Sequence, residues 1–143
     1  MLYLDTSALL KKYVKESGSG DVRVLISHEV FVATCSVTRA EAAAALARAV
    51  RTGSLTEPAA RQAHKAFVLE WKSYIRVRVT EALLARADGL AWSHRLRGYD
   101  AIHLAAALEW QDRLNESITL ATFDKELWAA AAETGIARFP AAL

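Results

Sequence analysis

Four acidic residues stand at or near the predicted starts of helices and could act together: Asp5, Glu41, Asp100 and Asp124. Several carboxylates that come close together cannot all stay ionised unless a cation neutralises them. A site made only of oxygen ligands, with no Cys or His partner, suits Mg²⁺ or Mn²⁺. Such ions lower the pKa of a bound water and stabilise a leaving oxygen. If the carboxylates meet, the chemistry they indicate is hydrolysis of a phosphodiester.

The elements that must position these acids alternate between strand and helix. Apolar or alternating runs predict strands before Asp5 and over 30–35, 74–79, 117–121 and 136–139, of which 74–79 is expected at a sheet edge. Helical patterns are expected over 6–14, 21–28, 36–52, 56–73, from 80 onward with a break at 88–89, over 100–113 and over 124–134. This order predicts an α/β fold, a single parallel sheet with helices on both faces.

The acids should meet because every strand-to-helix junction of a parallel sheet lies on the same edge. Asp5, the start of the Glu41 helix and Asp124 are placed there directly. Asp100 follows a helix instead, but its own helix must lead the chain to the other edge before the strand at 117–121. In the alanine-rich helix we expect Ser36 to be the N-cap and Glu41 to point toward the core side. The stripe that faces inward should consist of Val37, Ala40, Ala44 and Ala47.

Each of these residues also has a purely structural explanation. Asp5, Asp100 and Asp124 could be helix N-caps, and Glu41 could be a solvated side chain. His103, one turn beyond Asp100, is expected to be a hydrogen-bonded packing residue. The four tryptophans, Trp71, Trp92, Trp110 and Trp128, are expected in the core or at a dimer interface.

Composition describes an ordinary compact protein. The chain has 143 residues, 53% hydrophobic and 24% charged, which fits one domain over 1–143. No apolar run is long enough to span a bilayer, no signal peptide is visible, and the single cysteine, Cys35, fits a reducing cytoplasm. When these four acids are set aside, 18 basic residues remain against 12 of the 16 acidic ones. This excess of positive charge would give a modest attraction to a polyanion.

Three blocks of sequence resemble the signature blocks of PIN-domain proteins, and more narrowly of the VapC-type ribonuclease toxins of toxin–antitoxin pairs. They are Leu4-Asp-Thr-Ser-Ala-Leu9, Arg97-Gly-Tyr-Asp-Ala-Ile-His-Leu-Ala105 and Thr122-Phe-Asp-Lys-Glu-Leu127. The likeness covers the whole chain in order, and the middle block is the most specific.

The resemblance implies a five-stranded parallel sheet between helices and an acidic cluster that holds Mg²⁺ or Mn²⁺: Asp5, Glu41, Asp100 and Asp124. It implies supporting hydroxyls at Thr6, Ser7 and Thr122. It also implies single-stranded or structured RNA as the substrate, a homodimer, and a cognate antitoxin whose tail blocks the groove. Arg39 and Arg97 are candidates to hold a phosphate or an antitoxin carboxylate, although a solvated or structural ion pair explains each equally well.

Two other functions fit parts of the pattern. A PIN-like module that binds RNA or a partner without cutting it would have no use for clustered like charges. A phosphotransferase with Asp5 as nucleophile, as in haloacid-dehalogenase-like phosphatases, would need a second Asp where this chain has Ser7. Hydrolysis of RNA remains the leading prediction.

Overall fold

The first strand, β1, lies at the centre of the sheet. In the computed structural model, which describes residues 1–143, the sheet has five parallel strands in the order β3-β2-β1-β4-β5. The strands are β1 (Leu2–Leu4), β2 (Val32–Cys35), β3 (Ile75–Val77), β4 (Thr119–Ala121) and β5 (Ala137–Phe139). The predicted parallel sheet is confirmed, and the strand predicted over 74–79 lies at an edge as expected.

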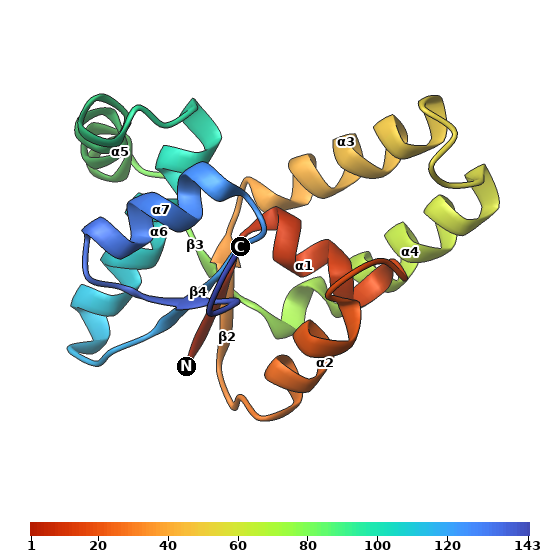
Figure 1. Cartoon of the computed structure of the whole chain (residues 1–143), viewed down its shortest axis with the longest axis horizontal. Helices are drawn as coiled ribbons and strands as arrows, with labels where there is room; N and C mark the ends of the chain where they lie inside the picture. Colours follow the sequence, from red (N-terminus) through yellow and green to blue (C-terminus); the bar gives the residue numbers. More distant parts are fainter.

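Seven α-helices and one 3₁₀ turn join these strands. They are α1 (Thr6–Tyr13), α2 (Ser19–Ser27), α3 (Thr38–Arg51), α4 (Glu57–Glu70), η1 (Trp71–Ser73), α5 (Glu81–His94), α6 (Gly98–Leu114) and α7 (Lys125–Glu133). Helices α5, α6 and α7 cover one face, α1 to α4 cover the other, and α3 and α4 extend beyond the sheet as a hairpin (Figure 1).

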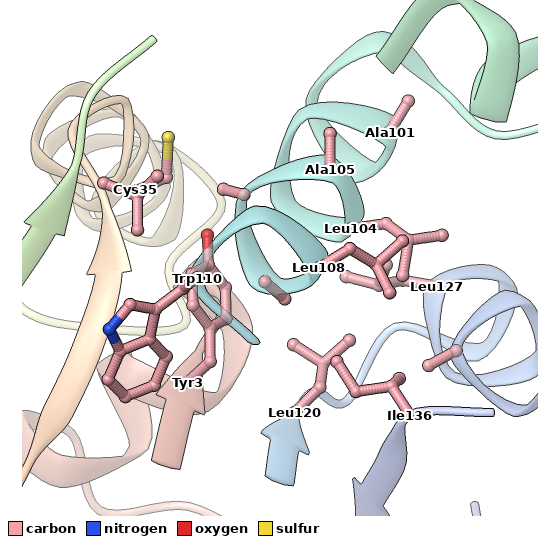
Figure 2. Close-up of a cluster of buried hydrophobic side chains, with 14 of the residues drawn as sticks. Tyr3, Cys35, Ala101, Leu104, Ala105, Leu108, Trp110, Leu120, Leu127 and Ile136 are labelled. Carbon is pink, nitrogen blue, oxygen red and sulfur yellow. The ribbon is translucent and has the colours of Figure 1, made fainter. Parts of the chain in front are cut away.

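Alternate residues of β1 supply the two cores, because successive side chains of a strand point to opposite faces. Tyr3 packs in the larger core with Leu104 and Leu108 of α6 and Leu127 of α7 (Figure 2). Leu2 and Leu4 pack on the other face, in the core that includes Leu9, Ala42, Phe67 and Trp71. Because both faces of β1 are buried, every residue of the strand can be apolar, and the apolar run ends just before Asp5.

Two boundary predictions are wrong. Helix α5 runs through Asp88 and Gly89 without a break and ends at His94, followed by the C-cap Arg95, which has a positive φ of 55°. A glycine costs an exposed helix only about 1 kcal/mol relative to alanine, and packing of Leu83 and Ala87 offsets it. Helix α3 starts at Thr38, and its cap position is Val37 instead of Ser36.

The predicted inward stripe of α3 is also wrong. The buried residues of the helix are Thr38, Ala42 and Leu46, whereas Ala40, Ala44 and Ala47 are exposed. The Thr38 hydroxyl lies 2.7 Å from that of Thr34 in β2, which fixes the rotation of the helix against the sheet. Glu41 still reaches the core side, because it lies three positions after the buried Thr38 and its carboxylate contacts Thr6 and His103.

None of the helices has the length and apolar character that crossing a bilayer requires. Among the tryptophans, Trp71 and Trp110 are buried as predicted, Trp128 is half-buried, and Trp92 is 83% exposed. Cys35 is buried and free.

Candidate functional site

The candidate site lies at the carboxyl ends of β1 and β4, the neighbouring strands at which the order of connection reverses. In open parallel sheets such a switch point leaves a crevice where ligands bind. Asp5 follows β1 directly, and its backbone N–H donates to the Ala121 carbonyl of β4 at 3.1 Å. Thr122 and Asp124 follow β4, so the backbone itself brings these residues together.

Asp5 is 4% exposed, and its carboxylate accepts hydrogen bonds from three groups. Its donors are the Ser7 hydroxyl at 2.8 Å, the Ala8 backbone N–H at 2.8 Å and the Thr122 hydroxyl at 2.9 Å. Burial raises the pKa of Asp5, and although nearby His103 and these bonds lower it, the net pKa lies above its ordinary value. Asp5 is also the N-cap of α1, so both explanations of this residue hold at once.

The hydroxyls expected to support the site tie its loops together. Ser7 Oγ also accepts from the Phe123 backbone N–H at 2.8 Å, and Thr122 Oγ1 accepts from the Asp124 backbone N–H at 3.0 Å. The start of α1 and the β4–α7 loop are therefore fixed relative to Asp5.

Glu41 is held by a buried chain of side chains from three elements. Its Oε2 accepts from the Thr6 hydroxyl at 2.6 Å and lies 2.7 Å from His103 Nε2. His103 is 2% exposed, and its Nδ1 lies 3.0 Å from the Tyr3 hydroxyl. Burial alone raises the pKa of Glu41, but the hydrogen bonds from His103 and Thr6 outweigh it and the net pKa is lowered. His103 is therefore the hydrogen-bonded packing residue that the sequence predicts.

Asp100 and Asp124 share one cation, the Arg97 guanidinium. Arg97 Nε donates to Asp100 at 2.8 Å and Arg97 Nη2 donates to Asp124 at 2.6 Å. Asp124 is the N-cap of α7, but the N-cap of α6 is Arg97, so capping does not explain Asp100. Burial raises the pKa of Asp100; Arg97 lowers it and Asp124 raises it, and the net pKa lies above the ordinary value.

Glu126 joins this pair, and sequence reasoning missed it. Carboxylate oxygens of Asp100, Asp124 and Glu126 all lie within 4.8 Å of one another. The signal was present as Asp124-Lys-Glu126, two acids two residues apart at the start of a helix. Asp5 and Glu41 lie outside this group of three. The predicted cluster therefore divides into an outer pair, Asp100 and Asp124, which is bound to Arg97, and two inner acids, Asp5 and Glu41, which accept hydrogen bonds from other donors.

The donor set fits Mg²⁺ or Mn²⁺. All the grouped atoms are carboxylate oxygens, the ligand type that these ions take. The Arg97 guanidinium bridging Asp100 and Asp124 also shows that the position favours positive charge. Asp100, Asp124 and Glu126 are the residues that would hold an ion there. Glu41 lines the same open hollow as Asp100.

An open hollow of about 570 Å³ gives access to Asp100 of this group. Its lining includes Glu41, Arg97, Tyr99 and Asp100. Arg39 lies in the first turn of α3, exposed and without a hydrogen bond or ion pair from its side chain. A second hollow, of about 410 Å³ between α3 and α4, is more apolar and does not include these acids.

Comparison with known proteins agrees with this geometry. The family model described as the PIN domain matches residues 2–133. Two curated proteins, Ribonuclease VapC45 and Ribonuclease VapC49 from two strains of Mycobacterium tuberculosis, are each 32% identical over 143 residues, which is 100% of this chain and 97% of theirs.

Two solved structures share the fold. The FitAcB crystal structure from Neisseria gonorrhoeae aligns with a TM-score of 0.65 at 18% identity, covering 97% of this chain and 96% of the other. The structure of FitAB bound to an IR36 DNA fragment aligns with a TM-score of 0.70 at 17% identity, covering 97% and 94%. At these identities the likeness concerns the fold alone.

Proposed function

This chain belongs to the PIN-domain family, and from that premise we propose that it is a metal-dependent endoribonuclease that acts as the toxin of a toxin–antitoxin pair. The observation that carries the proposal is the group of carboxylates at the β1–β4 switch point, in which helix capping does not account for Asp100. Full-length relatives named as ribonucleases support RNA as the substrate.

The side chains would divide the work by position. Asp100, Asp124 and Glu126 would hold Mg²⁺ or Mn²⁺, and Arg97 at the rim of the same hollow would bind a phosphate oxygen of the substrate. A bound ion would supply a water of lowered pKa and positive charge for the leaving oxygen. Glu41, kept ionised by His103 and Thr6, could accept a proton from a water in the hollow.

Asp5 would act on the shape of the site. Its bonds to Ser7 and Thr122 set the β4–α7 loop, and through that loop they set the position of Asp124. The inner acid thus orients the outer ones, while its raised pKa makes a nearby cation favourable. All four acids predicted from the sequence keep a place in the proposal, with Glu126 added.

Cleavage of total cellular RNA by the purified protein tests the proposal. We expect cleavage with Mn²⁺ or Mg²⁺ present, none with EDTA, and a loss of at least about a hundredfold in Asp100→Asn, because metal-held acids of this kind act as a unit. Glu116→Gln, an exposed acid beyond the far end of α6, is the matched control. RNA binding without cleavage by the wild-type protein would favour the non-catalytic module.

The proposal includes a cognate antitoxin and a homodimer as partners. The exposed Trp92 and, two turns earlier on α5, the partly exposed Leu84 support a second copy, because large apolar groups gain most from being covered. Light scattering of the wild-type protein and Trp92→Glu checks the dimer. Co-purification with the product of a small adjacent reading frame checks the antitoxin.

A further inference from the structure

Tyr99 stands beside the candidate metal ligands with nothing to hold it. It is 58% exposed in the first turn of α6, next to Asp100. The hydroxyls of the other three tyrosines, Tyr3, Tyr13 and Tyr74, all make hydrogen bonds within the chain. The Tyr99 hydroxyl makes none, and its ring packs against no other aromatic ring. An aromatic ring left free at the rim of a charged site is available to a ligand.

Two hollows meet at this residue. The hollow over the acids and a second one of about 730 Å³ are both lined by Glu41 and Tyr99. The second hollow follows α3, where its lining includes Ala45, Arg48 and Thr52. Together they make a continuous groove from Asp100 along α3, in which Glu41 to Thr52 span roughly 16 Å of helix.

Arg48 supplies a free cation in that groove. Its side chain is exposed and makes no ion pair or hydrogen bond, whereas Arg61, Arg86 and Arg113 are all paired with acids. The wall beside it is low, because three alanines line it, and two hydroxyl residues, Thr52 and Ser54, close its far end. Cationic, hydroxyl and aromatic groups are thus spaced along one open channel.

We propose that, in this groove, Tyr99 stacks on a base of the RNA substrate next to the cleaved bond and Arg48 binds a backbone phosphate. This inference rests on the proposed function and adds two residues that bind the substrate and the route by which it enters. Proteins that bind single strands use cationic side chains to hold the backbone and aromatic platforms on which bases stack.

The wall of the groove does not suit a peptide that binds as an added strand. A peptide bound in extended form needs unpaired main-chain groups, such as a strand edge. Here the wall is α3, whose backbone groups bond within the helix. A nucleotide chain needs no such partners, because stacking and phosphate contacts suffice.

Binding without cleavage tests the inference. A fluorescein-labelled single-stranded RNA 12-mer, titrated in EDTA and followed by anisotropy at several salt concentrations, separates stacking from charge. Tyr99→Ala should weaken binding by about 5- to 150-fold without changing the salt dependence, since stacking contributes about 1–3 kcal/mol per base. Tyr99→Phe should bind as the wild type does. Arg48→Gln should reduce the slope of log K against log salt by about 0.7, the value for one phosphate on a single strand.

Two variants at the amino edge of the sheet are matched controls. Phe31→Ala removes an aromatic ring that is 54% exposed next to β2, and Lys72→Gln removes an exposed cation in η1. Both should bind RNA as the wild type does, and circular dichroism should show that every variant is folded.

Three results would overturn the inference. Unchanged binding in Tyr99→Ala would remove the stacking platform, and equal loss in Tyr99→Phe would show that the hydroxyl acts instead. An unchanged salt dependence in Arg48→Gln would show that Arg48 binds no phosphate, and together with unchanged binding in Tyr99→Ala it would reassign the groove to a protein partner. In each case the wild-type protein would still cleave RNA with Mn²⁺, whereas failure of the proposed function would abolish cleavage by the wild type whether or not it binds RNA.

Discussion

At the residue scale, Arg97 occupies the place between Asp100 and Asp124 where a divalent ion would bind. Its guanidinium and the ion would compete for the same carboxylate oxygens. The side chain is mostly exposed, so it can leave that position and turn to a phosphate at little cost. Arg97 thereby provides charge balance without the ion and a substrate contact with it.

Replacement of Arg97 should therefore strengthen metal binding. We expect Arg97→Gln to bind Mn²⁺ more tightly than the wild type by about 2- to 30-fold, because the ion no longer displaces two exposed ion pairs that contribute roughly 0.2–1 kcal/mol each. Titration calorimetry with Mn²⁺ measures this difference. Arg113→Gln, which removes an ion pair with Glu109 at the far end of α6, is the control. Weaker binding in Arg97→Gln would contradict the competition.

Asp100 should make the metal-free protein less stable as the pH rises. Because burial raises its pKa, the folded state keeps the proton to a higher pH than the unfolded state. Folding therefore becomes less favourable as the pH rises from the ordinary Asp pKa, about 4, to the raised value. In EDTA, urea denaturation should give Asp100→Asn and the wild type similar free energies of unfolding near pH 4 and a higher one for Asp100→Asn at pH 7. A difference independent of pH would rule out this linkage.

At the element scale, the Tyr3–His103–Glu41 chain joins β1, α6 and α3 below the site. Tyr3 and His103 are both buried, so each depends on the other for a hydrogen-bond partner. Thr6 adds the start of α1 to the same carboxylate. The helices that carry Glu41 and Asp100 are thus held to the central strand through side chains as well as through packing.

Tyr3→Phe tests this coupling with one atom removed. We expect a loss of about 1–3 kcal/mol in the free energy of unfolding, because His103 Nδ1 is left buried without a partner. Urea denaturation measures it, and the midpoint should shift while the slope stays constant. Tyr74→Phe, which removes a less buried hydroxyl near Glu70 on the opposite face of the sheet, serves as a comparison and should lose less.

The order of elements could be predicted because strands buried on both faces are short apolar runs and their helices carry strong patterns. The position of Asp100 followed from the same topology, since α6 must lead to the start of β4. Helix α3 shows the limit. Nearly solid alanine gives no contrast between faces, and its rotation depends on a hydroxyl contact between Thr34 and Thr38 that no periodicity reveals.

The sequence predicts which edge of the sheet carries the site, but it does not predict the directions in which the side chains of the site point. Asp5, Asp100 and Asp124 were placed at one edge of the sheet, yet Asp5 turns inward to Thr122 and Ser7, and Glu126 takes a place in the outer group. These directions depend on rotamers and on partners far away in the chain. The free state of Tyr99 could not be predicted either, because it depends on the absence of neighbours.

At the scale of the whole molecule, a bound ion would join α6 to α7, because Asp100 comes from one and Asp124 and Glu126 flank the start of the other. Those carboxylates meet only in the folded chain, so an ion that binds them stabilises folding by mass action. At a free Mn²⁺ concentration a hundred times its Kd, the gain is about 2.7 kcal/mol. For a chain of this length that raises the Tm by about 5–10 °C.

Thermal unfolding of acid variants with Mn²⁺ or EDTA should show which carboxylates hold the ion. We expect the wild type to gain these degrees in Mn²⁺, Asp124→Asn to gain almost none, and Glu116→Gln to gain as much as the wild type. Glu126→Gln should lose more of the gain than Glu41→Gln, because Glu126 lies within the group of three and Glu41 is held by His103 and Thr6. If Glu41→Gln loses more, the ion lies deeper, toward Asp5. A Tm that is the same in Mn²⁺ and EDTA for the wild type would mean that these carboxylates hold no ion.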